Sequence, residues 1–238
     1  MAASSLLLLL ADGRFPAGAH AHSGGLEAAV AAGRVTDLAS LEAFLVGRLA
    51  TAGLVGAAFA AAAHRAALAG AVDPADPARS AARSRALARL DAELDARTAA
   101  PTLRAVSRRQ GRALLRAGRE IWPHAPFGDL PTGPGGAHQP LVLGLLCAAA
   151  GLSRTETATV SAYATVTGAA SAGVRLLGLD PYRVQALLVG LADACDGTAA
   201  DAARAADDPP ERLPAAAAPL ADIHAEVHAT WEVRLFAS

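Results

Sequence analysis

Histidine spacing offers the most evident metal chemistry in this sequence. His20 and His22 are separated by one residue in a Gly- and Pro-rich stretch, and His224 and His228 occupy one face of a predicted C-terminal helix. Imidazoles at such spacing can chelate a transition metal, but each pair supplies too few ligands, and the H-E-x-x-H order of metalloproteases is absent. His20, His22 and His228 are therefore weak candidates for metal contact, and surface or capping histidines are the default interpretation.

A cationic helix is predicted to begin at Pro101, and Glu120 is its only acidic residue. Its basic side chains are Arg104, Arg108, Arg109, Arg112, Arg116 and Arg119. Nucleic acid is disfavoured as a partner, because no motif of a nucleic-acid fold is present and 21 basic residues are balanced by 22 acidic ones. Two alternatives stay open: an acidic partner surface, or ion pairs with Asp91, Glu93 and Asp95.

Other catalytic chemistry is weakly represented. Ser23, Ser107 and Ser153 are the serines to consider as nucleophiles, but none lies in a G-x-S-x-G elbow and nothing designates a triad. The chain contains no lysine, which excludes a P-loop, a Schiff-base mechanism and attachment of pyridoxal phosphate. A binding protein is favoured over an enzyme, with a helical-bundle enzyme that uses an unrecognised cofactor as the alternative.

The positioning elements are predicted to be helices. Alanine is the commonest residue and aromatic residues make up only 4% of the chain, so we expect an all-α, single-domain bundle of about eight to ten helices. Leu49 to His64 carries no formal charge and is expected to be a buried central helix, not a membrane span. Cys147 and Cys195 lack the spacing of a zinc site and are expected to be buried free thiols in the cytoplasm.

The most irregular stretch is Phe15 to Glu27, between two predicted helices. Pro16 restricts the backbone, while Gly18, Gly24 and Gly25 permit angles closed to other residues. Either Ser23 or the glycines could begin the following helix, which includes Leu26 and Glu27. A helix connector is the simplest interpretation of such a loop.

The C-terminal part divides into two further segments. Residues 1–206 are predicted to form the helical domain, 207–221 a Pro- and Ala-rich linker, and 222–238 a flexible amphipathic tail. Ile223, Val227, Trp231 and Phe236 have near-helical spacing over Asp222 to Phe236. Such a tail docks either on its own domain or on a partner.

Four blocks in order resemble the UreF-type urease accessory proteins. Phe15-Pro16-Ala17-Gly18 and His22-Ser23-x-Gly25-Leu26-Glu27 resemble the family's N-terminal signature, P-[VI]-G-x-[FY]-x-H-S-x-G-L-E. The other three are Arg104-x-x-Ser107-x-x-Gln110-Gly111, His138-x-Pro140-Leu141-Val142-x-Gly144, and His228 with Arg234-Leu235-Phe236-x-Ser238. Two departures are His20, where the family usually has an aromatic residue, and Ala229, where it has a glutamate.

This resemblance implies a helical, non-catalytic protein that forms a homodimer. It implies that the protein binds the accessory subunit UreD (also called UreH), recruits the nickel-carrying GTPase UreG to apo-urease, and couples GTP hydrolysis to nickel insertion. No tightly bound cofactor is implied, and transient Ni²⁺ contact is a further hypothesis. No nucleic acid or membrane partner is implied. The partner-binding residues carried over are Pro16, Gly18, His20, His22, Ser23, Gly25, Leu26, Glu27, Arg104, Ser107, Gln110, Gly111, His228, Arg234, Leu235 and Phe236.

Overall fold

The computed structural model describes residues 4–16, 18–69 and 76–237. No β-strand occurs among these residues, so the predicted all-α class is confirmed. The α-helices are α1 (Ser4–Ala11), α2 (Leu26–Ala31), α3 (Leu38–Arg48), α4 (Leu54–Leu68), α5 (Pro77–Arg97), α6 (Pro101–Ile121), α7 (Gln139–Ala149), α8 (Arg154–Leu177), α9 (Pro181–Gly190), α10 (Ala192–Ala205) and α11 (Pro219–Ala229).

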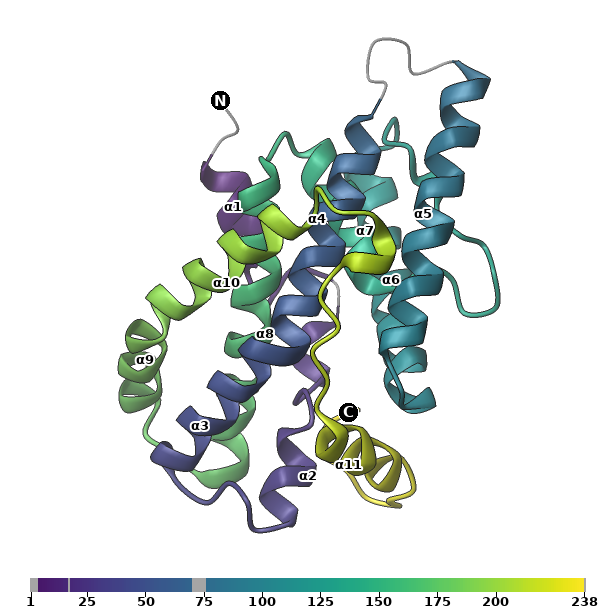
Figure 1. The fold of residues 1–238 in the computed structure, drawn as a ribbon. Helices are drawn as coiled ribbons and strands as arrows, with labels where there is room; N and C mark the ends of the chain where they lie inside the picture. Colours follow the sequence, from purple (N-terminus) through teal and green to yellow (C-terminus); the bar gives the residue numbers. More distant parts are fainter. Residues whose placement is uncertain (1–3, 17, 70–75, 238) are drawn as a thin grey trace.

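Helix α4 is the centre of the bundle. It packs against α5 and α7 on one side and against α8 and α10 on the other (Figure 1). Small residues allow this close packing: a Cβ atom added to Gly144 of α7 would lie 2.3 Å from the carbonyl oxygen of Ala60 in α4. The side chains of α4 from Ala57 to His64 are all buried, and Nε2 of His64 lies 2.7 Å from the carbonyl oxygen of Leu152. The predicted buried central helix is thus confirmed from Ala57 to His64, whereas Ala50 and Ala52 near its predicted start are exposed.

The π-helical segment η2 (Leu49–Gly53) joins α3 and α4 into one run, Leu38–Leu68. Counted with α3 and α4 as one helix, the described part of the chain falls within the predicted range of eight to ten helices. By length and composition this run could also cross a membrane, and within the described ranges it is the only such helix. Core helices pass the same test, and the α4 portion of the run lies in the core.

Local sequence signals explain several helix boundaries. Asp37 begins α3 with a capping box in which Ser40 is the reciprocal partner, and Ser153 begins α8 in the same way with Glu156. Pro101 and Pro181 occupy the first positions of α6 and α9, where the missing N–H would have no intrahelical acceptor. Cys147 and Cys195 are buried free thiols, as predicted.

The C-terminal helix is shorter than predicted. Helix α11 begins at Pro219 and ends at Ala229, so the predicted helix from Asp222 to Phe236 is wrong beyond Ala229. The reason is tertiary: the chain turns back towards α2, where the N–H groups of Leu235 and Phe236 donate to Glu27 and that of Ala237 donates to the carbonyl oxygen of Ala21. Helix α11 itself packs against α2 and α6.

Residues 210–218, here called the C-terminal strap, connect the bundle to α11 and run across the face of α4 (Figure 1). The strap begins with a short 3₁₀ helix, Pro210–Arg212. The guanidinium group of Arg97 donates hydrogen bonds to the carbonyl oxygens of Pro210, Glu211, Leu213 and Pro214. One side chain of α5 therefore holds the strap at four points. The flexibility predicted for the tail, residues 222–238, stays a prediction.

Candidate partner-binding site

The loop between α1 and α2 has a left-handed backbone at all three of its predicted glycines, with φ of 64° at Gly24. Gly18 has φ of 72° and Gly25, which precedes α2, has φ of 89°, a left-handed conformation that side chains disfavour. Ser23 is buried, and its Oγ accepts a hydrogen bond of 3.2 Å from the N–H of Glu27. Leu26 is completely buried in the core, whereas Pro16 is exposed. The loop is thus fixed at its α2 end by both backbone and side-chain constraints.

Glu27 connects this loop to the C-terminal tail. Its Oε1 accepts a hydrogen bond of 2.7 Å from the N–H of Leu235, and its Oε2 accepts one of 3.1 Å from the N–H of Phe236. Nε2 of His228 lies 2.9 Å from the same Oε2. Burial raises the pKa of Glu27, but the hydrogen bonds from Leu235, His228 and Phe236 outweigh it and lower the pKa below its ordinary value. An ionised Glu27 therefore holds the tail against α2.

The tail places its residues in two different environments. Phe236 is buried, with the Arg175 guanidinium 4.9 Å from its ring centroid, and the N–H of Ala237 donates to the carbonyl oxygen of Ala21. Arg234 and Leu235, in contrast, have exposed side chains. The predicted residues of the tail therefore divide into an anchor and an outward-facing pair; Ser238 lies outside the described residues.

The predicted Arg-x-x-Ser-x-x-x-Gly pattern of α6 holds neighbouring segments together. Arg104 donates hydrogen bonds to the carbonyl oxygens of Thr98 and Ala99 at the end of α5. A Cβ atom added to Gly111 would lie 2.3 Å from the carbonyl oxygen of Ala137, so the backbone before α7 packs directly against α6 at this glycine. Gln110 is half-buried on the same helix. Arg104 and Gly111 thus act inside the fold.

Ser107 belongs to a buried network centred on His138. The N–H of Gln139 donates to Ser107 Oγ at 3.2 Å, and His138 Nδ1 lies 3.0 Å from the same oxygen. Nε2 of His138 lies 3.0 Å from Asp95 Oδ1, and the N–H of His138 donates to Asp91. These partners fix the imidazole: Nδ1 accepts from the serine hydroxyl and Nε2–H donates to Asp95. The network joins α5, α6 and the start of α7.

The order Ser107, His138 and Asp95 has the connectivity of an acyl-transfer triad, but its setting favours a structural role. The imidazole of His138 has no exposed surface, so it cannot reach a leaving group at the surface. Burial, outweighing the Asp95 hydrogen bond, lowers the pKa of His138 and favours the neutral ring. The three residues therefore clamp α6 to α5 and α7.

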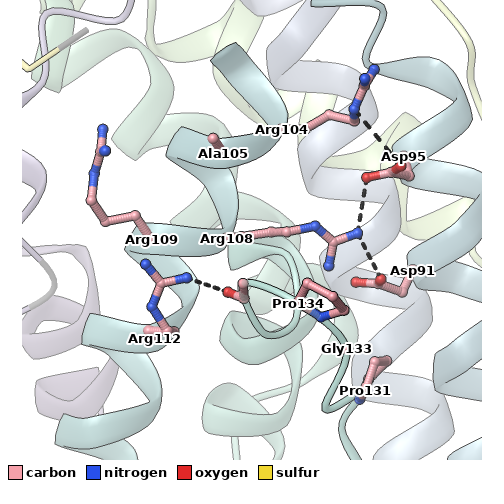
Figure 2. Close-up of a pocket in the computed structure, with 11 residues that line it drawn as sticks. Asp91, Asp95, Arg104, Ala105, Arg108, Arg109, Arg112, Pro131, Gly133 and Pro134 are labelled. Atoms are coloured by element: carbon pink, nitrogen blue, oxygen red, sulfur yellow. Dashed lines mark hydrogen bonds and ion pairs between the residues drawn. The ribbon is translucent and has the colours of Figure 1, made fainter. Parts of the chain in front are cut away.

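Ion pairs, one of the two predicted alternatives, are formed by Arg104 with Asp95 and by Arg108 with Asp91 and Asp95, whereas Glu93 pairs with Arg97 of α5. Figure 2 shows Arg108 between Asp91 and Asp95, at 3.0 and 2.9 Å, with Arg104 beside Asp95. Arg112 donates to the carbonyl oxygen of Gly135 in the loop before α7. These groups line a pocket of about 580 Å³. Arg109 also lines it, but its side chain points away from Asp91 and Asp95 (Figure 2).

Loop, α6 and tail meet on one surface of the molecule. His22 lies close enough to Arg109 that the guanidinium, after burial as the main cause, helps to lower the pKa of His22 to about 4. The N–H of Thr102 at the start of α6 donates to the Glu226 carboxylate of α11 at 2.8 Å. Glu27 completes the connection between loop and tail.

Comparisons with known proteins identify the family that this chain resembles. The UreF family model matches residues 35–192, and three relatives bear the name "Urease accessory protein UreF". The chain is 42% identical to the relative from Mycolicibacterium vanbaalenii over 238 residues and 43% identical to that from Mycobacterium sp. (strain JLS) over 239, with all of each chain covered. It is 42% identical to the relative from Mycobacterium tuberculosis (strain H37Rv) over 202 residues, 85% of this chain and 86% of that one.

The chain belongs to the UreF family. Within this UreF-family chain, the sequence pattern did not indicate that His138 joins the ion pairs of Asp91, Asp95 and Arg108. His138 has no local sequence signal of this role, because its partners come from helices distant in sequence. The only available signal was its place in the H-x-P segment that resembles the family.

The metal candidates of this UreF-family chain do not form one cluster. His20 is exposed and His22 lies beside it, whereas His228 is buried against Glu27. The centroid of the His228 ring lies 4.7 Å from that of Trp231, with the two rings tilted by 56°. Across the residues that the structure describes, no group of three or more His, Cys, Asp or Glu side chains is arranged to hold a metal ion. His20 and His22 together can supply two neighbouring imidazoles and no more.

Proposed function

We propose that this chain is a non-catalytic scaffold for urease maturation. It binds UreD (UreH) and recruits the GTPase UreG to apo-urease, as a homodimer within a cytoplasmic complex that couples GTP hydrolysis to nickel insertion. Membership of the UreF family over the full length of its relatives supports the urease connection. The observation that carries the binding role is the composite surface built on Glu27, where loop, α6 and tail meet.

Arg234 is the residue of this surface best suited to a partner contact. Its side chain is exposed, while its neighbour Phe236 is buried and fixed through Glu27. A guanidinium held outward on an anchored segment loses little conformational freedom when it pairs with a carboxylate. The anchor thus supplies position, and Arg234 supplies the contact.

Urease activation in cells carrying the whole urease operon tests this proposal. Arg234→Ala is expected to lower urease activity by tenfold or more without lowering the amount of folded protein, because a charge-assisted contact of about 1.5–3 kcal/mol is lost. Arg85→Ala, an exposed arginine on α5, is the matched control. Full activation by the Arg234 variant would contradict the role given to the tail.

We further propose that nickel contact on this chain is weak and confined to His20 and His22. The low pKa of His22 leaves its ring neutral at pH 7, the form that binds metals, while the nearby Arg109 charge opposes a bound cation. His228 is excluded because Glu27 already holds it. In calorimetric titration of the purified complex with Ni²⁺, the double variant His20→Ala/His22→Ala should lose a weak binding event; an unchanged isotherm contradicts the proposal.

A further inference from the structure

A second concave region lies beside the composite surface and is not explained by it. This groove has a volume of about 570 Å³. It is bounded by the start of α2, by α3 and η2, by the end of α5 and the start of α6, and by residues 216–224. Much of its lining is apolar, including Phe44, Val55, Leu94, Leu103, Pro140 and Leu220. Its size and lining are those of a ligand-binding groove.

Arg48 gives this groove a specific chemistry. The guanidinium donates from Nη1 to the carbonyl oxygen of Gly24 and lies 5.9 Å from the ring centroid of Phe44. Its Nε is buried and has no hydrogen-bond partner, the only such side-chain nitrogen or oxygen among the described residues. Native proteins pair the great majority of their buried polar groups, so an N–H left this way indicates a missing acceptor.

The charge of Arg48 is also uncompensated. No carboxylate of the described residues forms an ion pair with it, although Arg97 in the same groove is paired with Glu93. Asp222 is the only acidic side chain that lines the groove, and it makes no ion pair with Arg48. Burial lowers the pKa of Arg48 to about 10, so the group remains a cation at neutral pH. Arg48 as a whole is half-buried. A partly desolvated cation without a counter-charge is destabilising, and an incoming carboxylate would relieve that cost.

We propose that the groove binds an extended segment of a partner protein that carries a carboxylate side chain beside an apolar one. The carboxylate pairs with the Arg48 guanidinium, and the apolar side chain packs between Phe44, Val55 and Leu103. Charge complementarity selects an anion, and the apolar lining selects the neighbouring side chain. Gly25 and Ser107 line the same groove, which makes it continuous with the composite surface. The identity of the partner as a urease-maturation protein rests on the proposed function.

The chemistry of the groove is tested first with a small probe. Anilinonaphthalene sulfonate combines an apolar body with an anionic group, and its fluorescence reports binding. Arg48→Gln should weaken its binding about tenfold or more, and octanoate should displace it where octylamine does not. Arg183→Gln, on an exposed part of α9, is the matched control and should bind as the wild type does. Equal binding by the Arg48 and control variants would overturn the proposal.

A second variant guards against a folding defect. Ala43 is exposed on α3 and lines the groove, so Ala43→Trp should fill it without removing any charge. Circular dichroism and thermal melting check that both variants fold. If Ala43→Trp binds the probe as tightly as the wild type, the groove is not the binding site and the proposal fails.

The protein partner is tested by capture with purified UreD, UreG and apo-urease. Weaker capture of one of these proteins by both Arg48→Gln and Ala43→Trp supports the proposal, with an affinity loss of about tenfold expected. Unchanged capture by both variants overturns the groove as a protein-docking site while leaving the proposed function intact. If the wild type captures none of the three, the proposed function fails, and the probe measurements still decide whether the groove binds an anion.

Discussion

Replacing Glu27 with glutamine is expected to release the C-terminal tail. The buried carboxylate receives hydrogen bonds from the N–H groups of Leu235 and Phe236 and contacts His228. Hydrogen bonds to a charged group contribute about 1.5–3 kcal/mol each, and glutamine keeps only one acceptor oxygen while directing an NH₂ group at these donors. We therefore expect a loss of roughly 2–4 kcal/mol in the free energy of tail docking.

Amide hydrogen exchange measures this loss directly. Since 1.4 kcal/mol corresponds to a factor of ten, protection of the Leu235 and Phe236 amides should fall by about 30- to 1,000-fold in Glu27→Gln. Glu232→Gln, an exposed position in the same tail, is the control and should leave protection unchanged. Unaltered protection at Leu235 and Phe236 in the Glu27 variant would refute the anchoring role.

The same anchor should depend on pH. The pKa of Glu27 is lowered in the folded protein, because its hydrogen bonds outweigh the opposing effect of burial. A carboxyl group with a depressed pKa contributes stability that is present above its unfolded pKa and is lost as the pH falls through the folded pKa. Protection of the tail amides should therefore persist from pH 7 to pH 5 and decrease in more acidic solution.

Two further predictions concern the core. Gly111→Ala should lower the free energy of unfolding by about 1–3 kcal/mol, because the added methyl group overpacks against Ala137. The control Gly168→Ala, in open space on α8, should be neutral or stabilising by up to about 1 kcal/mol. Equal stability of the two variants in urea denaturation would contradict the close packing of Gly111 against Ala137. The pKa values of His64 and His138 are lowered chiefly by burial, so their contribution to stability should be lost as the pH falls from above 6.5 through their folded pKa values. A melting temperature that is unchanged by this acidification, or that rises, would contradict burial of both rings in neutral form.

The sequence by itself determined the helical class and many helix starts. Alanine-rich composition and the capping signals at Asp37 and Ser153 act within one turn of backbone, so they can be recognised without tertiary information. The apolar run up to His64 similarly predicted the central helix, because only burial accommodates such a stretch in a folded domain. The ordered blocks that resemble UreF proteins also came from sequence alone, and the family was confirmed.

Only the tertiary structure decided which of these residues act together. Glu27 and Leu235 are 208 positions apart. No local pattern indicates that the Glu27 carboxylate accepts hydrogen bonds from the backbone that follows α11. His138 lacked any sequence-local partner, yet Ser107 and Asp95 surround it, and Arg48 becomes notable only because the fold buries its Nε without an acceptor. Local propensity is fixed by neighbours along the chain, whereas hydrogen-bond partners and burial depend on helix packing that brings distant residues into contact.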